Sequence, residues 1–205
     1  SFPYTINWSQ EHVPAIVHMA HSSQDEGWAL AQVLFGDYNP GGHTVVTWPA
    51  SMDELPPMLD YDIRHGRTYM YAKGTPLYPF GHGLSYTTFD FASLRTDKPT
   101  LARDGQLEVS VDVTNTGKVP GDAVPQLYVQ HLGSKVDRPA QQLAGFSRLH
   151  LAPGETKTVR IPLKASQLAY WDATRKAFVV EQEPVRLMIG ASAADVRLRA
   201  EVAVE

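Results

Sequence analysis

The stretch QLEVSVDVT (106–114) alternates between apolar and polar residues along its whole length. Its apolar residues fall on one side of an extended chain: Leu107, Val109, Val111 and Val113. Successive side chains of a strand point to opposite faces, so this pattern predicts a strand with one face in a core and the other in solvent. TVRIPL (158–163) and VRLRAEVAV (196–204) repeat the alternation.

Turn-forming clusters separate these strands, at NTGKVPG (115–121), LGSKVDRP (132–139) and APGET (152–156). Several short strands with regular turns and no helical window predict an antiparallel β-sandwich. The length of this region suits one immunoglobulin-like or fibronectin-like module, which has about 100 residues.

The N-terminal part has a different texture. AIVHMA (15–20) and HTVVTW (43–48) are short apolar runs suited to buried strands, and WALAQVLF (28–35) between them is apolar nearly all round and ends at Gly36. Strand, helix and strand in this order predict a parallel sheet covered by helices. About one such unit is too little for a complete α/β domain, so we interpret this part as the end of a larger one.

We therefore expect an α/β fragment at residues 1–87, followed at 88–205 by an all-β immunoglobulin-like (fibronectin type III-like) sandwich. The aromatic-rich stretch YPFGHGLSY (78–86) lies where the texture changes. It is either a loop that grips a ligand or a stiff seam, included in the first part as residues 76–87, and its composition favours the seam over a flexible linker. The seam interpretation predicts burial between the two parts for Pro79, Phe80 and Tyr86.

Composition excludes several classes of protein and site. The 205 residues carry a net charge of −4, which gives no basic face for nucleic acid. No apolar run approaches the roughly 20 residues of a membrane helix. The absence of cysteine excludes disulfides, thiolate metal sites and a cysteine nucleophile. The first residues show neither an initiator Met nor a signal-peptide pattern, so we expect the chain to begin inside a longer protein.

Several stretches in order resemble motifs of the family 3 glycoside hydrolases. In the first part these are HSSQDEG (21–27), ALAQVLFGDYNPGGHTVVTWP (29–49) and PLYPFGHGLSYTTFDF (76–91). In the second part they are VTNTG (113–117), QLYV (126–129), DRPAQQLAGF (137–146) and LAPGET (151–156). DYDIRHGRTYMY (60–71) is similar to the β-xylosidase and β-glucosidase members of the family.

The resemblance implies a retaining β-glycosidase without a cofactor, acting on terminal β-linked glucose or xylose. In this family a barrel domain supplies the nucleophilic Asp, an α/β sandwich domain often supplies the acid/base Glu, and a fibronectin type III-like domain commonly ends the chain. Only the last part of the α/β domain and the fibronectin-like domain have counterparts here. Both catalytic carboxylates are therefore expected upstream of Ser1, and no catalytic residue is assigned to this chain. The resemblance also favours a periplasmic or secreted protein.

The first candidate for substrate binding is the loop after AIVHMA. Open α/β sheets bind ligands beyond the carboxyl ends of their strands, so His21, Gln24 and Glu26 are candidates for the rim of a substrate crevice. The alternative is structural, because Ser23 and Glu26 have capping-box spacing and Asp25 falls in the first turn of the predicted helix.

The second candidate is the charged loop DYDIRHGRTY, in which Asp62 and Arg67 are the proposed substrate contacts. Arg and carboxylate groups hold sugar hydroxyls through charge-assisted hydrogen bonds. The alternative is a solvated loop with internal ion pairs. Family members often carry an Arg where this chain has Met70, so any role of that Arg is in doubt here.

The remaining histidines and tryptophans favour structural roles. His18 on a predicted strand and His21 on a loop have poor geometry for a shared ion, so no metal site is expected. His82 is expected to be a packed seam residue. Trp28 and Trp48 are expected in the α/β core.

The resulting hypothesis is that this part supports a catalytic barrel and lines its outer subsites. Its partners would be the missing barrel and the rest of the α/β domain, in the same precursor or a separate chain, or a second copy of the chain. The alternative is a non-catalytic module that binds carbohydrate or protein. An exposed aromatic row on the sandwich would favour that alternative, and the candidates for it are Tyr128, Tyr170 and Trp171.

Overall fold

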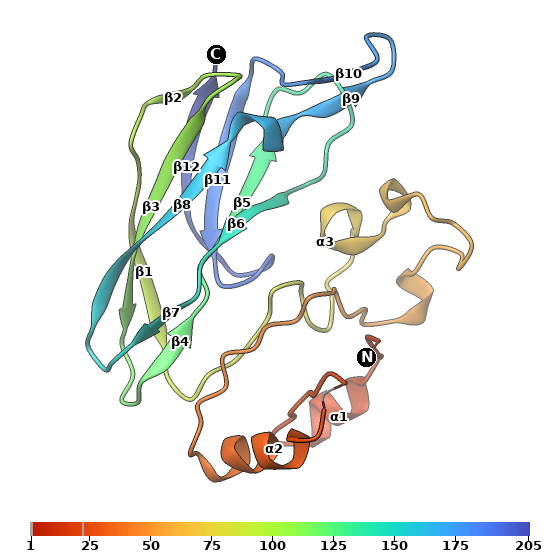
Figure 1. Cartoon of the computed structure of the whole chain (residues 1–205). Coiled ribbons are helices and arrows are strands. Elements are labelled where there is room, and N and C mark those ends of the chain that lie inside the picture. Colours follow the sequence, from red (N-terminus) through yellow and green to blue (C-terminus); the bar gives the residue numbers. More distant parts are fainter. Residues whose placement is uncertain (1, 22) are drawn as a thin grey trace.

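A computed structural model describes residues 2–21 and 23–205 and shows a β-sandwich with a mostly irregular N-terminal part along one side (Figure 1). One sheet has the order β1-β3-β8, with strands Phe89–Thr96, Gln106–Asn115 and Thr156–Lys164. The other has the order β2-β12-β11-β5-β6, with strands Thr100–Leu101, Val196–Val204, Pro184–Gly190, Gln126–His131 and Gln142–Phe146. Two small pairs and a 3₁₀ turn complete it: β4 (Gly121–Ala123) with β7 (Leu149–Leu151), β9 (Tyr170–Asp172) with β10 (Ala177–Val179), and η3 (Ala165–Leu168).

The core of the sandwich lies between the two large sheets, as the alternation in β3 predicts. The four apolar residues of that strand are fully buried, and they belong to one cluster with Leu127, Leu187 and Ile189 of the facing sheet. Burying one such side chain contributes roughly 1.5–3 kcal/mol. The large sheets are antiparallel except at one edge, where β2 pairs in parallel with the end of β12, Thr100 opposite Ala203. The expectation of a wholly antiparallel sandwich is wrong at this edge.

The N-terminal part contains short helices and loops. Its elements are α1 (Asn7–His12), α2 (Glu26–Phe35), η1 (Met52–Glu54), η2 (Ile63–His65) and α3 (Thr68–Tyr71). The predicted helix is confirmed as α2, and it ends where expected because Gly36 adopts a left-handed conformation with φ 82°.

Both strands predicted in the N-terminal part are wrong for this chain. Residues 15–20 form no strand, and residues 43–48 contribute a single bridge from Trp48 to Tyr78. The physical reason is that a strand needs a neighbour for its backbone hydrogen bonds, and no described strand lies beside either run.

The predicted burial of the two tryptophans separates in the same way. Trp48 is 5% exposed, packed against the rings of His18 and Tyr78, which confirms its core role. Trp28 on α2 is 68% exposed, so that expectation is wrong here. The capping box is also wrong, because Asp25 is the N-cap residue and makes no side-chain cap hydrogen bond.

The seam forms around Phe80 and Gly81. The Phe80 ring stacks on Tyr69 with centroids 4.4 Å apart and packs against the cluster containing Tyr128 of β5. Gln126 Nε2 donates to the Gly81 carbonyl at 3.0 Å, and Ala193 N donates to the Phe80 carbonyl at 2.9 Å. These contacts join the N-terminal part to the sandwich.

Other seam residues follow the expectation less closely. Pro79 is half-buried, and half-buried His82 stacks on Tyr78 at 5.3 Å, as expected of a packed residue. Burial lowers the pKa of His82. Tyr86 is 53% exposed, so its predicted burial is wrong. Its hydroxyl donates instead to the Val33 carbonyl of α2 at 2.8 Å.

Gly81→Ala is expected to destabilise the chain more than Gly154→Ala. Both glycines have left-handed φ values, 79° and 75°, which cost a substituted Ala about 1 kcal/mol. A Cβ at Gly81 would lie 2.1 Å from Gln126 Oε1, whereas one at Gly154 meets nothing within 4 Å. Urea unfolding should show an extra loss of about 2 kcal/mol for Gly81→Ala, because buried hydrogen bonds of Gln126 are broken. Equal losses for the two variants would mean that this contact does not hold the seam.

Candidate functional site

The strongest candidate site is the charged loop at residues 57–67, which its own side chains hold in shape. Arg64 donates to both carboxylate oxygens of Asp62, from Nε at 2.8 Å to Oδ1 and from Nη2 at 2.5 Å to Oδ2. His65 Nδ1 donates to Asp60 Oδ2 at 2.7 Å. The internal ion pairs foreseen as the structural alternative are therefore present.

Arg67 binds backbone carbonyls of this loop and makes no ion pair with another described residue. Its Nε donates to the Asp60 carbonyl at 2.6 Å and its Nη2 to the Pro57 carbonyl at 2.7 Å. The role that the structure shows for Arg67 is thus to fix the curvature of the loop.

The ionic partners keep both carboxylates charged. Hydrogen bonds from Arg64 hold the pKa of Asp62 well below its usual range. The hydrogen bond from His65 lowers the pKa of Asp60. Ionised carboxylates only accept hydrogen bonds, so this loop can receive hydroxyl donors but offers no acid proton near neutral pH.

Helix α3 ties the loop to the sandwich. Leu143 N of β6 donates to the Tyr69 hydroxyl at 3.0 Å, and Ala140 N donates to the Met70 carbonyl at 2.9 Å. Burial raises the pKa of Tyr69 and Tyr71, and for Tyr71 the charge of Asp137 adds to the effect.

Asp137 is a site residue that the sequence analysis did not single out. Its charge raises the pKa of Arg64 as well as that of Tyr71, which places it in the electrostatic field of the charged loop. It lies in the turn LGSKVDRP, some 70 residues along the chain. The only available signal was its position in a motif of the resemblance, and no spacing rule connects it to Asp62.

The other predicted contacts lie elsewhere. His21, Gln24 and Glu26 are exposed and sit just before or at the start of α2. Figure 1 places α2 and α3, which follows the charged loop, on different sides of the N-terminal part. Within the residues that the structure describes, these three side chains do not join Asp62 and Arg67 in one site.

Two searches of the described residues bear on other functions. No group of three or more His, Asp or Glu side chains among residues 2–21 and 23–205 could hold a metal ion. None of the helices over the same residues is long and apolar enough to cross a membrane.

Sequence profiles match both parts of the chain. The Glycosyl hydrolase family 3 C-terminal domain matches residues 1–86, and the Fibronectin type III-like domain matches residues 123–193. These matches confirm the predicted fold class of an α/β part followed by a fibronectin type III-like sandwich.

Relatives and solved structures agree with the profiles. The chain is 36% identical to a "Periplasmic beta-glucosidase" of Salmonella typhimurium over 95% of its own length, and 39% identical to a "Beta-xylosidase" of Formosa agariphila over 93%. It spans 27% of the length of each of these proteins. The crystal structure of Beta-D-glucoside glucohydrolase from Trichoderma reesei covers 89% of the chain with a TM-score of 0.78 and 31% identity, and the chain covers 29% of it.

Arg64→Met is expected to raise the pKa of Asp62 toward its ordinary value of 3.8, because the largest cause of the shift is removed. Asp60 serves as the internal control, since its own shift comes chiefly from His65. A carboxyl lowered in the folded state stabilises the fold above its ordinary pKa, and this stabilisation is lost as pH falls through the lowered value. The variant should therefore lose less stability than the parent chain under acid. Carboxyl NMR titration measures both groups, and an unmoved Asp62 would contradict the pairing.

Proposed function

Because the chain belongs to the family 3 glycoside hydrolases and carries their C-terminal region, we propose that it is part of a retaining β-glycosidase. The whole protein would hydrolyse terminal non-reducing β-D-glucosyl or β-D-xylosyl residues. The proposed role of this part is to buttress the catalytic barrel and to line its outer subsites. Residues 1–87 and 88–205 are its two proposed structural units.

The observation that carries this proposal is the anchored, charged loop at 57–67. The Asp62 carboxylate remains partly exposed although Arg64 orients it, and Arg67 fixes the backbone beneath. The α3 contacts hold the loop against the sandwich. A preorganised carboxylate suits sugar hydroxyls, because the loop loses little conformational entropy on binding.

The chemistry of the same loop favours catalysis outside this chain. Retaining hydrolysis needs two carboxyl groups about 5 Å apart, one nucleophilic and one protonated. Asp60 and Asp62 both have lowered pKa values, which opposes a role as general acid. The nucleophile and the acid are therefore proposed to lie in the barrel and the rest of the α/β domain, and His21, Gln24 and Glu26 stay proposed rim residues.

The surface of the N-terminal part supports a partner for this region. Large apolar side chains on it are strongly exposed: Phe2, Trp8, Trp28, Phe35, Met58 and Leu59. Covering apolar surface contributes roughly 25 cal/mol per Å², and patches of this kind mark interaction sites. The proposed partner is the remainder of the enzyme, in the same precursor or as a separate chain, or a second copy of this chain.

In a protein that includes the barrel, Asp62→Asn is expected to raise KM for a β-linked disaccharide about tenfold, with kcat little changed. The loss of one charge-assisted hydrogen bond to substrate is worth roughly 1.5 kcal/mol. An aryl glycoside of the same sugar places no second sugar in an outer subsite, so its KM should stay unchanged.

The 205-residue chain alone is the control and should not cleave aryl β-glucosides or β-xylosides. Turnover by this chain that survives repurification and disappears in Glu26→Ala or Asp62→Ala would overturn the assignment of catalysis to the barrel.

Limited proteolysis of the chain at high dilution is expected to remove residues 1 to about 85 first. Few buried apolar contacts protect that part, whereas the sandwich has a closed core. Mass spectrometry should find a resistant fragment that starts between Thr87 and Leu94. Equal resistance of both parts, in a sample that light scattering shows to be monomeric, would contradict the need for a partner.

A further inference from the structure

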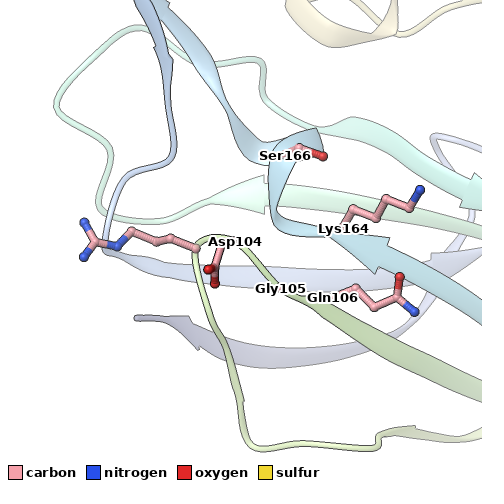
Figure 2. Close-up of a pocket in the computed structure, with 6 residues that line it drawn as sticks. Asp104, Gly105, Gln106, Lys164 and Ser166 are labelled. Atoms are coloured by element: carbon pink, nitrogen blue, oxygen red, sulfur yellow. The ribbon is translucent and has the colours of Figure 1, made fainter.

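The sandwich carries two adjoining cavities at an end remote from α1 and α2 (Figure 1). The larger, about 520 Å³, lies between Phe178 and Val180 on one side and Arg103, Asp104 and Glu205 on the other. The smaller, about 350 Å³, shares Arg103 and Asp104 and continues along Gln106 and Lys164. Figure 2 shows the side chains of Asp104, Gln106 and Lys164 around it. Because they share residues, the two cavities form one elongated open track.

An exposed aromatic pair borders this track. Trp171 and Phe178 are direct partners in the β9–β10 register, so their side chains stand on the same face of that hairpin. Their rings lie 5.3 Å apart at 72° and are part of residues that are 55% and 75% exposed. Phe178 lines the larger cavity, and Trp171 extends the aromatic surface outward from it.

The hairpin that presents this pair is held by its own turn. Asp172 Oδ1 accepts hydrogen bonds from the backbone N of Thr174 and of Arg175, at 2.9 and 3.0 Å. Arg175 also forms an ion pair with Asp172 at 3.4 Å. The aromatic surface is thus preorganised, which reduces the entropy lost on binding.

The polar groups of the track have unused hydrogen-bonding capacity. Over residues 2–21 and 23–205, the side chains of Arg103, Asp104 and Gln106 make no hydrogen bond or ion pair with another described residue. By contrast, most other arginines of the chain are engaged, for example Arg138 with Glu181 and Arg186 with Glu201.

Charge and shape narrow the class of ligand. Arg103 and Lys164 are balanced by Asp104 and Glu205, so the track favours a neutral ligand over a phosphate or a basic peptide. Exposed rings cover the apolar face of a sugar, while the planar Arg and carboxylate groups exchange hydrogen bonds with its hydroxyls. The length of the track suits several sugar units in a row.

We propose that this track, called here the Trp171 platform, binds a neutral β-linked polysaccharide chain. It is separate from the charged loop at 57–67 and goes beyond the proposed function, because it holds polymer without acting on it. Of the three aromatics considered from the sequence, Tyr128 is fully buried, and Tyr170 is half-buried with Arg138 over its ring at 4.8 Å. Trp171 remains, and Phe178 across the hairpin completes the surface.

Affinity gel electrophoresis of the 205-residue chain tests the platform without reference to turnover. Soluble mixed-linkage β-glucan or xylan in the gel should retard the chain, and α-linked dextran should not. Trp171→Ala and Phe178→Ala should each weaken binding about tenfold, the effect of losing roughly 1.4 kcal/mol of stacking. Arg103→Ala should weaken it severalfold.

Phe146→Ala is the matched control, since Phe146 is an exposed aromatic on strand β6 of the same sandwich, 65% exposed and away from the track. It should bind like the parent chain. The proposal is overturned if neither β-linked polymer retards the chain, if dextran retards it equally, or if Trp171→Ala and Phe178→Ala bind like Phe146→Ala. Unchanged circular dichroism of the variants excludes unfolding as the cause of a loss.

Discussion

The contact of Gly81 with Gln126 is the constraint on which the arrangement of this chain depends. Gln126 Nε2 donates to the carbonyls of Gly81 and Ala191, and its Oε1 accepts from the Tyr128 hydroxyl at 2.5 Å. A buried amide with all these partners satisfied is stabilising, whereas a partly satisfied one is costly. Only a residue without a side chain fits the space, because a Cβ at Gly81 would collide with Gln126. The seam therefore adopts one register against the sandwich.

This register determines what the sandwich does for the charged loop. With Gly81 in place, Phe80 stacks on Tyr69, and Tyr69 in turn accepts the backbone hydrogen bond of Leu143. Helix α3 begins directly after Arg67, so the loop at 57–67 is held at a fixed place on the sandwich. A fibronectin-like domain thus acts at a distance on a candidate substrate loop, through packing rather than through its own chemistry.

The chain contains two very different balances of buried surface. The sandwich closes its core with its own strands, and its largest apolar residues are fully buried. The N-terminal part leaves Trp28 and Phe35 of α2 in solvent. These residues are the same ones that sequence patterning assigns to a core, so pattern and structure differ because the pattern describes a larger body than the one formed by these residues.

The sequence by itself determined the features that depend on neighbours along the chain. The period of two in residues 106–114 predicted the buried face of β3, and Gly36 predicted the end of α2. Ordered motifs identified the family, because they hold information that periodicity does not. The charged loop was also recognised, with its alternative of internal ion pairs.

Only the tertiary structure decided features that join distant residues. It brought Asp137 to Arg64 and Tyr71, removed the strands expected at 15–20 and 43–48, and placed Phe178 beside Trp171. Strand formation depends on hydrogen bonds to a neighbour, and burial depends on what covers a side chain. Neither property is encoded in the residues of one segment, so each was decided by which parts of the chain meet in space.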